Sequence, residues 1–288
     1  EQVVTLGSGQ KVRFLANDLR RERTGIHAKL ALYAVRNDIQ TLLAWDQCNI
    51  ESHDRRIRLA NAASKALALS PDANLQLAHD LHVFAAGVWN RHLEALIPEN
   101  VEGDPLTPIE FLLKPYILVN SGTIMFAPPG TTKSYTAMLQ LVAVDAGVNG
   151  LWETKKRRGL YINLERSRAS MIRRLGSVNT ALGLDPSRPL LILNARGKTL
   201  AAVADIVERT IVKYDIGFVV LDSISRAGMG NLTEDRPANM TIDILNRFEI
   251  AWLALAHTAR TKYKNLTDQH IFGSTMFDAG ADIVVQLH

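Results

Sequence analysis

Apolar residues in the first hundred positions follow two different spacings, one typical of strands and one typical of helices. Residues 2–50 carry short alternating stretches, which are typical of half-buried strands. They predict strands at Val12–Leu15, Ile26–Tyr33 and Gln40–Trp45. Apolar residues then recur at helical spacing and predict two helices, at Asp54–Leu69 and Asn74–Leu96. We therefore expect a small α+β domain at residues 1–98.

Beyond residue 120, short apolar runs alternate with helical segments. The runs lack polar alternation, as expected for strands of a parallel sheet that is covered on both faces. The predicted strands are Thr123–Phe126, Leu160–Leu164, Leu190–Leu193, Phe218–Leu221, Trp252–Ala256 and Ile283–Leu287. The predicted helices are Ser134–Asp145, Arg168–Leu182, Leu200–Tyr214 and Ala238–Phe248. This order predicts an α/β core with a mainly parallel sheet at residues 120–288.

A stretch rich in turn-forming residues separates the two patterns. It contains Gly103, Pro105, Pro108 and Pro115. Glycine and proline interrupt helices and strands, so we expect a linker at residues 99–119.

Composition excludes several classes of protein. Apolar residues make up 47% of the 288 positions, which is enough to build a sizeable core. The single cysteine, Cys48, excludes an internal disulfide framework and a multi-cysteine zinc site. No apolar run approaches the length of a membrane span, and no secretory signal opens the sequence. We expect a cytoplasmic protein that does not contact membranes.

The clearest chemical motif is Ala127-Pro-Pro-Gly-Thr-Thr-Lys-Ser134, between a predicted strand and a predicted helix. A phosphate-binding loop requires this context, because loop N–H groups and the positive end of the helix surround the phosphates. Lys133 supplies charge to the β and γ phosphates of ATP, and the Ser134 hydroxyl can ligate Mg²⁺. The residues predicted to bind ATP here are Ala127, Pro128, Pro129, Gly130, Thr131, Thr132, Lys133, Ser134 and Tyr135.

Two positions depart from the usual pattern G-x-x-x-x-G-K-[ST]. Ala127 replaces the first glycine, and Thr132 replaces the glycine before the lysine. Glycine is favoured where the backbone approaches a ligand or adopts a positive φ. Thr132 therefore leaves open a slow or absent turnover, and a turn of this composition can also occur without a ligand.

Three other apolar strands end in residues that suit ATP chemistry. Asp222 follows Gly217–Leu221, so it is expected at the carboxyl edge of the sheet, where it can hold Mg²⁺. Glu165 can orient or deprotonate the attacking water, and His257 can donate a hydrogen bond to the γ-phosphate. Each residue also has a plain structural alternative: capping a turn, starting a helix or packing at a strand end.

The order of these motifs resembles the RecA/DnaB-type P-loop ATPase superfamily, most of all its hexameric helicase-like AAA branch. The similar stretches are Leu160-Tyr-Ile-Asn-Leu-Glu-Arg-Ser167, Val220–Arg226, His257-Thr258 and Phe272–Thr275. The resemblance runs from about Ser121 to the end and implies a RecA-like core. It also implies a catalytic role for Glu165 with Lys133 and His257, Mg²⁺ beside Asp222, and Arg174 stacking on adenine. Such proteins work as homo-oligomeric rings, usually hexamers, with ATP at the subunit interfaces.

A basic segment follows the His257 strand and contains Arg260, Lys262 and Lys264. In the resembling family this region contacts single-stranded DNA, whose phosphates such cations would hold; the alternative is a solvated surface loop. We therefore expect an ATP-driven motor on single-stranded nucleic acid, helicase-like, in replication or recombination. Two alternatives stay open: a regulatory ATPase that remodels a protein, and a module that binds nucleotide without hydrolysing it.

The first domain carries no catalytic motif. Between Lys11 and Arg58 the sequence contains ten lysines and arginines and six acidic residues. Such a basic balance can neutralise nucleic-acid phosphates, and it is also typical of a solvated face. Trp45 and Trp89 are expected in the core, because large aromatic residues usually anchor small domains. We expect an accessory domain that docks on nucleic acid or on a partner.

Overall fold

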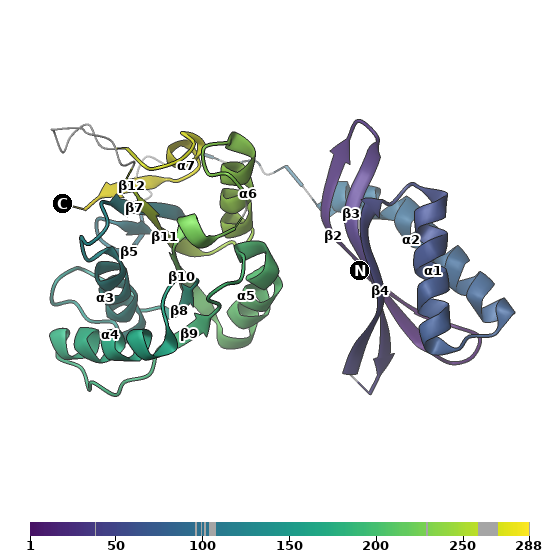
Figure 1. Ribbon diagram of the computed structural model, residues 1–288, viewed down its shortest axis with the longest axis horizontal. Coiled ribbons are helices and arrows are strands. Elements are labelled where there is room, and N and C mark those ends of the chain that lie inside the picture. The colour runs from purple at the N-terminus through teal and green to yellow at the C-terminus, as the bar shows by residue number, and fades with distance from the viewer. Residues whose placement is uncertain are drawn as a thin grey trace. The chain divides into compact units, whose positions relative to one another are not determined.

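The structure is a computed structural model (Figure 1). It describes residues 1–37, 39–95, 97–98, 100, 102–103, 108–228, 230–258 and 270–287. The chain divides into two compact units, Glu1–Asp104 and Pro105–His288.

The first unit is an antiparallel sheet with two helices on one face (Figure 1). Its strands pair in the order β1-β2-β3-β4: β1 (Gln2–Thr5), β2 (Lys11–Glu22), β3 (Gly25–Arg36) and β4 (Ile39–Asn49). The helices are α1 (His53–Leu67) and α2 (Pro71–Ala95). Inward residues such as Phe14, Leu30 and Leu32 pack on Leu59 and Phe84 of the helices. The predicted strands and helices of this region are confirmed, and the short strand β1 was not predicted.

The expectation that Trp45 lies in the core is wrong. Trp45 is 57% exposed, whereas Trp89 is half-buried and lies against His92 with the ring centroids 5.4 Å apart. Strand β4 lies at the edge of the sheet, and its inward positions are held by residues such as Cys48 and Ala44. Because successive side chains of a strand point to opposite faces, Trp45 lies on the face that neither helix of this unit covers.

The second unit is a six-stranded parallel sheet between helices, which confirms the predicted α/β core. Its strands are β7 (Gly122–Ala127), β8 (Arg158–Asn163), β9 (Leu191–Asn194), β10 (Ile216–Asp222), β11 (Ala251–His257) and β12 (Ile283–Gln286). They pair in the order β12-β7-β11-β10-β8-β9, every pair being parallel. The helices are α3 (Lys133–Ala146), α4 (Arg168–Ala181), α5 (Leu200–Tyr214), α6 (Asp235–Asn246), α7 (Met276–Ala279) and the 3₁₀ helix η1 (Ile224–Arg226).

Alternate residues of the central strands fill two cores, one on each face of the sheet. Tyr161, Phe218 and Leu253 pack with residues of α3 and α4, such as Leu141 and Met171. The neighbouring strand residues pack with α5, α6 and α7 on the other face (Figure 1). Two covered faces explain the unbroken apolar runs, and the parallel order brings the carboxyl ends of the strands to one edge.

Part of the predicted linker differs from the structure. Within residues 99–119, β5 (Phe111–Leu113) and β6 (Ile117–Leu118) form an antiparallel pair that belongs to the second unit. Leu112, Leu113 and Ile117 are buried in the core beside α3. The prolines suggested a linker without regular structure. The two strands form because the apolar residues between the prolines pack into the core of the second unit.

No helix within the described residues combines the length and the apolarity that a lipid bilayer requires of a spanning segment. The compartment in which the protein works stays a prediction.

Candidate nucleotide-binding site

The predicted site residues meet at the carboxyl edge of the parallel sheet. In register, His257 at the end of β11 lies beside Ala127 at the end of β7, and Asp222 at the end of β10 lies beside Asn163 of β8. A cavity of about 270 Å³ opens at this edge. Its lining includes residues 129–135, Glu165, Arg174, Asp222 and His257.

The turn between β7 and α3 has the backbone that a phosphate-binding loop needs. Gly130 has φ 88°, and Thr132 has φ 62° and ψ 9°, both in the left-handed region. The first helical residue is Lys133, so the positive end of α3 points at the cavity. Threonine adopts the glycine-like conformation at a cost of about 1–2 kcal/mol. Thr132 therefore strains the loop in the conformation that a glycine adopts readily.

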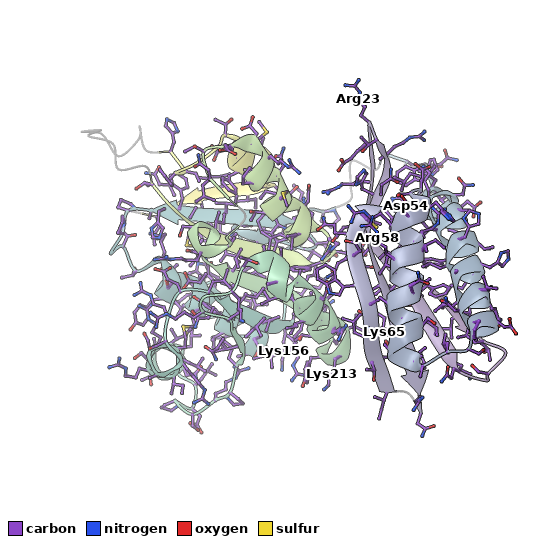
Figure 2. All side chains as sticks on the ribbon, turned by 45° about the vertical axis from the view of Figure 1, so that its right-hand side comes forward. Arg23, Asp54, Arg58, Lys65, Lys156 and Lys213 are labelled. Atoms are coloured by element: carbon purple, nitrogen blue, oxygen red, sulfur yellow. The ribbon has the colours of Figure 1, made fainter. Side chains whose placement is uncertain are left out.

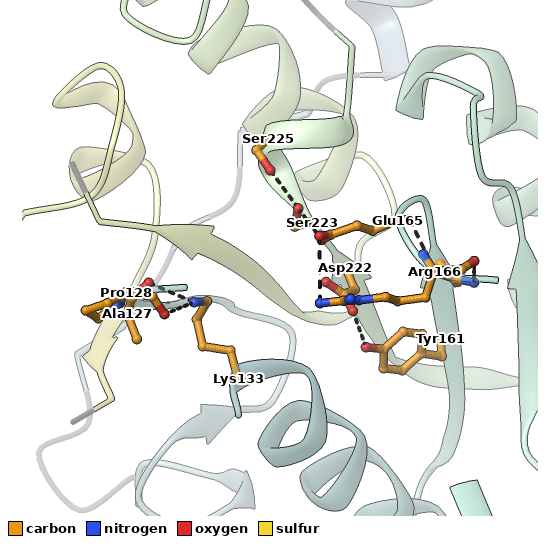
Figure 3. A network of polar contacts seen from close by, with 10 residues as sticks. Ala127, Pro128, Lys133, Tyr161, Glu165, Arg166, Asp222, Ser223 and Ser225 are labelled. Carbon is orange, nitrogen blue, oxygen red and sulfur yellow. Dashed lines mark hydrogen bonds and ion pairs between the residues drawn. The ribbon is translucent and has the colours of Figure 1, made fainter. Parts of the chain in front are cut away.

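Lys133 holds this loop from inside. Its side chain is 7% exposed, and its ammonium group donates hydrogen bonds to the carbonyl oxygens of Ala127 (2.7 Å) and Pro128 (2.8 Å) (Figure 3). Burial lowers the pKa of Lys133, and the carboxylates of Asp222 and Glu165 oppose that effect. A buried cation whose neighbours are mostly neutral carbonyls is well placed to exchange them for anionic oxygens.

Asp222 is almost completely buried, at 1% exposed. The Tyr161 hydroxyl donates a 2.7 Å hydrogen bond to its Oδ2 (Figure 3), and the Ser134 side chain also hydrogen-bonds to it. Burial raises the pKa of Asp222, while these two hydrogen bonds lower it. The hydroxyl and carboxylate predicted to ligate Mg²⁺ are therefore adjacent.

Glu165 stands across the cavity on the turn that follows β8. The Ser223 hydroxyl donates to its Oε2 at 3.3 Å, and the Arg166 guanidinium lies 3.9 Å from its Oε1 (Figure 3). The fully buried Asn163 fixes this turn, because its Oδ1 accepts from the backbone N–H of Glu165 (3.3 Å) and of Arg166 (2.8 Å). The carboxylate is thus placed by the end of the strand rather than by a loose loop.

His257 lies half-buried between the phosphate loop and Asp222. Burial lowers the pKa of its imidazole, and the Lys133 charge lowers it further. Its Nδ1 is buried without a hydrogen-bond partner among the described residues. A neutral imidazole has one N–H donor, so His257 is suited to donate to an oxygen in the cavity.

Arg174 and Tyr135 form one wall of the cavity. The guanidinium of Arg174 lies over the Tyr135 ring, 4.4 Å from its centroid, and that ring residue is 40% exposed. Stacking of Arg174 on adenine stays a prediction, and Tyr135 is the aromatic partner that the arginine already has.

The predicted nucleic-acid contacts Arg260, Lys262 and Lys264 lie outside the described residues. The structure describes the two flanks of that segment. Thr258 pairs with Ile271, and the N–H of Phe272 donates to the carbonyl of His257 at 2.7 Å. Gly273, with φ 130°, lets the chain approach the Leu232 carbonyl, where a Cβ would lie 2.7 Å away. The described residues on both sides of the basic segment therefore lie beside His257.

Comparison with known proteins agrees with this geometry. A family model described as an AAA domain matches residues 91–262, more than half of the chain, and includes the phosphate loop, Glu165, Asp222 and His257. The chain belongs to this AAA domain family. AAA domains are P-loop ATPases, and they generally bind ATP with Mg²⁺. No curated protein matches the chain.

The residues of this AAA domain fit the magnesium and the nucleotide that its family uses. Mg²⁺ prefers oxygen ligands and is usually held by one or two carboxylates together with phosphates and water. Asp222 and Ser134 supply that donor set, and the described residues hold no cluster of three His, Cys, Asp or Glu that suits another metal. Lys133 and the N-terminus of α3 supply the positive charge for phosphates.

Four residues of the site were given no role from the sequence. Tyr161 holds Asp222, Asn163 fixes the turn before Glu165, and Arg166 and Ser223 contact the Glu165 carboxylate. Tyr161 and Asn163 lie in an apolar strand, whose pattern is typical of core residues. The stretch Leu160–Glu165 was singled out as a whole, but only its glutamate was given a role. The chemical roles assigned to Lys133, Glu165, Asp222 and His257 stay predictions, although the structure brings these residues together.

Proposed function

We propose that this AAA domain drives a helicase-like motor on single-stranded nucleic acid, and that it works as a homo-oligomeric ring of the RecA/DnaB type. The observation that carries the proposal is the convergence of Lys133, Glu165, Asp222 and His257 from four elements on one cavity. The described residues that flank the basic segment, Thr258 on one side and Ile271 and Phe272 on the other, lie beside His257. A conformational change that follows loss of the γ-phosphate can therefore pass through His257 to residues that can bind nucleic-acid phosphates.

Each residue has a role that follows from its position. Mg²⁺, when bound, neutralises phosphate charge and orients the γ-phosphate. Lys133 exchanges its two carbonyl acceptors for phosphate oxygens, and Asp222 with Ser134 holds the metal. Glu165 orients the attacking water and accepts its proton, with Ser223 and Asn163 keeping the carboxylate in place. The His257 N–H donates to the γ-phosphate and connects its state to the backbone of Phe272.

The test is the rate of ATP hydrolysis with and without single-stranded oligo(dT), at low and high protein concentration. We expect oligo(dT) to stimulate hydrolysis more than duplex DNA does, and the rate per subunit to rise with concentration as rings form. Lys133→Ala is the inactive control. Hydrolysis that ignores nucleic acid at both concentrations contradicts the motor and favours a protein-remodelling ATPase. ATP binding without any hydrolysis favours a nucleotide-binding module.

A further inference from the structure

The sheet of the first unit has one face without a helix. Leu30, Leu32 and Phe14 point to α1 and α2, so their neighbours along each strand point the other way. We call this second side the open sheet face. Its strand register places six side chains of interest on it: Lys11, Arg13, Lys29, Tyr33, Leu42 and Trp45.

These side chains form rows across the three longest strands. Arg13, Tyr33 and Leu42 are in register in one row, and Leu15, Ala31 and Trp45 are in register in the next. The following row contains Asn17, Lys29 and Gln47. Neighbouring rows are about 7 Å apart along the strands. Trp45 therefore lies diagonally between an aromatic ring and a cation.

Exposure on this face is unusual for such residues. Trp45 is 57% exposed and Leu42 is 48% exposed. A large aromatic side chain left in water forgoes about 1.5–3 kcal/mol of burial. Surface aromatics of this kind are typical of binding surfaces.

Charge identifies the kind of partner. Lys11, Arg13, Arg20 and Lys29 lie on the open sheet face, against the carboxylates of Glu22 and of Glu1, which pairs with Arg13. Arg20 pairs with Glu22 at 2.8 Å, and both side chains remain more than 40% exposed. Cations alternating with aromatic rings and amides match phosphates alternating with bases.

The width of the sheet favours single strands over the major groove of an undistorted duplex. The major groove of B-DNA is about 12 Å wide and admits a helix or a two-stranded ribbon. Four strands spaced by about 4.8 Å span about 14 Å between the outer strand axes, before side chains are added. The open sheet face is therefore too broad for the groove, whereas unstacked bases can lie flat on it.

We propose that the open sheet face binds single-stranded nucleic acid, with Trp45 and Tyr33 stacking on bases and Lys11, Arg13 and Lys29 contacting phosphates. The proposal rests on the proposed motor function, to which it adds a second contact with the same strand. A strand bound to the first unit remains attached to the chain when the second unit releases it. Binding at this face needs no ATP.

The experiment measures the affinity of the full chain for fluorescently labelled oligo(dT) by anisotropy, without ATP, over a range of salt concentrations. Trp45→Ala is expected to weaken binding by at least about fivefold, because base stacking contributes about 1–3 kcal/mol per base. Trp45→Phe keeps a ring for stacking and is expected to bind nearly as wild type. This second variant separates stacking from any effect of Trp45→Ala on folding.

The charge arm uses two matched double variants. Lys11→Gln with Lys29→Gln is expected to reduce the salt slope of log affinity by about 1.4, since each phosphate contact on a single strand contributes about 0.7. The control, Arg58→Gln with Lys65→Gln, removes the same charge from the exposed side of α1, where both residues are labelled in Figure 2. The control is expected to leave the slope unchanged.

The outcomes separate this proposal from the motor. The proposal for the open sheet face is overturned if Trp45→Ala binds oligo(dT) as tightly as wild type, or if both double variants lower the salt slope equally. In that case, continued stimulation of ATP hydrolysis by oligo(dT) would still support the motor. If binding depends on Trp45 but oligo(dT) does not stimulate ATP hydrolysis, the result supports binding at the open sheet face and contradicts the motor. Equal affinity for duplex and single strands also overturns the proposal for the open sheet face.

Discussion

Removing the Tyr161 hydroxyl tests how the site holds Asp222, the carboxylate that we propose to bind Mg²⁺. Tyr161→Phe keeps the ring, which is fully buried in the core beside α3, and deletes only the 2.7 Å donor to Asp222. Asp222 is 1% exposed, so water cannot readily replace that donor. A hydrogen bond to a charged acceptor contributes about 1.5–3 kcal/mol. At about 1.4 kcal/mol per tenfold, the loss corresponds to about 10- to 100-fold.

The assay is the Mg²⁺ dependence of ATP hydrolysis, recorded at several pH values. The Mg²⁺ concentration for half-maximal rate is expected to rise by about 10- to 100-fold in Tyr161→Phe. The acidic limb of the pH profile is expected to move to higher pH. The sign follows from the carboxylate: Tyr161 stabilises the charged form and lowers the pKa of Asp222, so its loss leaves more Asp222 protonated at a given pH.

Tyr116→Phe is the matched control, because Tyr116 packs on the same core and does not line the cavity. A structural defect alone would lower the melting temperature and the rate without changing the Mg²⁺ requirement. Unchanged Mg²⁺ dependence together with an unmoved acidic limb in Tyr161→Phe would refute the role given to the Tyr161–Asp222 hydrogen bond.

Three other changes have defined outcomes. Glu165→Gln is expected to bind ATP as the wild type does but to hydrolyse it at least about 10²-fold more slowly in single-turnover kinetics. A smaller loss of rate would show that another residue accepts the proton of the attacking water. Thr132→Gly is expected to raise the free energy of unfolding by up to about 1 kcal/mol, measured by thermal unfolding, because φ 62° suits glycine. A decrease of more than about 1 kcal/mol would show that the threonine side chain stabilises the loop. The lowered pKa of His257 means that this residue stabilises the fold above the ordinary His pKa, and that the contribution is lost as the pH falls below it. His257→Gln is therefore expected to show a smaller fall in melting temperature on acidification through that pH. Melting temperatures that fall equally in the variant and the wild type would contradict the lowered pKa of His257.

The parts of the site that are local in sequence were predictable. A buried strand, a turn and a helix that begins with Lys133 and Ser134 lie within twenty-five residues, Gly122–Ala146, and the loop chemistry depends on little else. Asp222, Glu165 and His257 were also predictable, because each lies at or just beyond the carboxyl end of a buried apolar strand and parallel strands present those ends at one edge. The strand order that makes Asp222 a neighbour of β8 was not predictable.

The remaining features depend on contacts between distant residues. Tyr161 reads as a core aromatic, and only the pairing of β8 with β10 shows that its hydroxyl meets a carboxylate sixty-one positions away. Trp45 was expected in the core because large aromatic residues usually anchor small domains. The alternation in its strand does not tell which face meets the helices. Strands β5 and β6 were missed because Pro115 and the neighbouring turn residues outweighed two short apolar runs, Phe111–Leu113 and Ile117–Leu118.

The most direct test of the central claim is calorimetric titration of Mg²⁺ and ATP into the wild-type chain, into Lys133→Ala and into Lys156→Ala. Lys156 is an exposed lysine of the same unit that does not line the cavity, so it controls for the loss of one charge. The account predicts saturable binding to the wild type and to Lys156→Ala, lost or weakened at least about tenfold in Lys133→Ala. Absence of binding to the wild type, or equal binding by all three proteins, would contradict it.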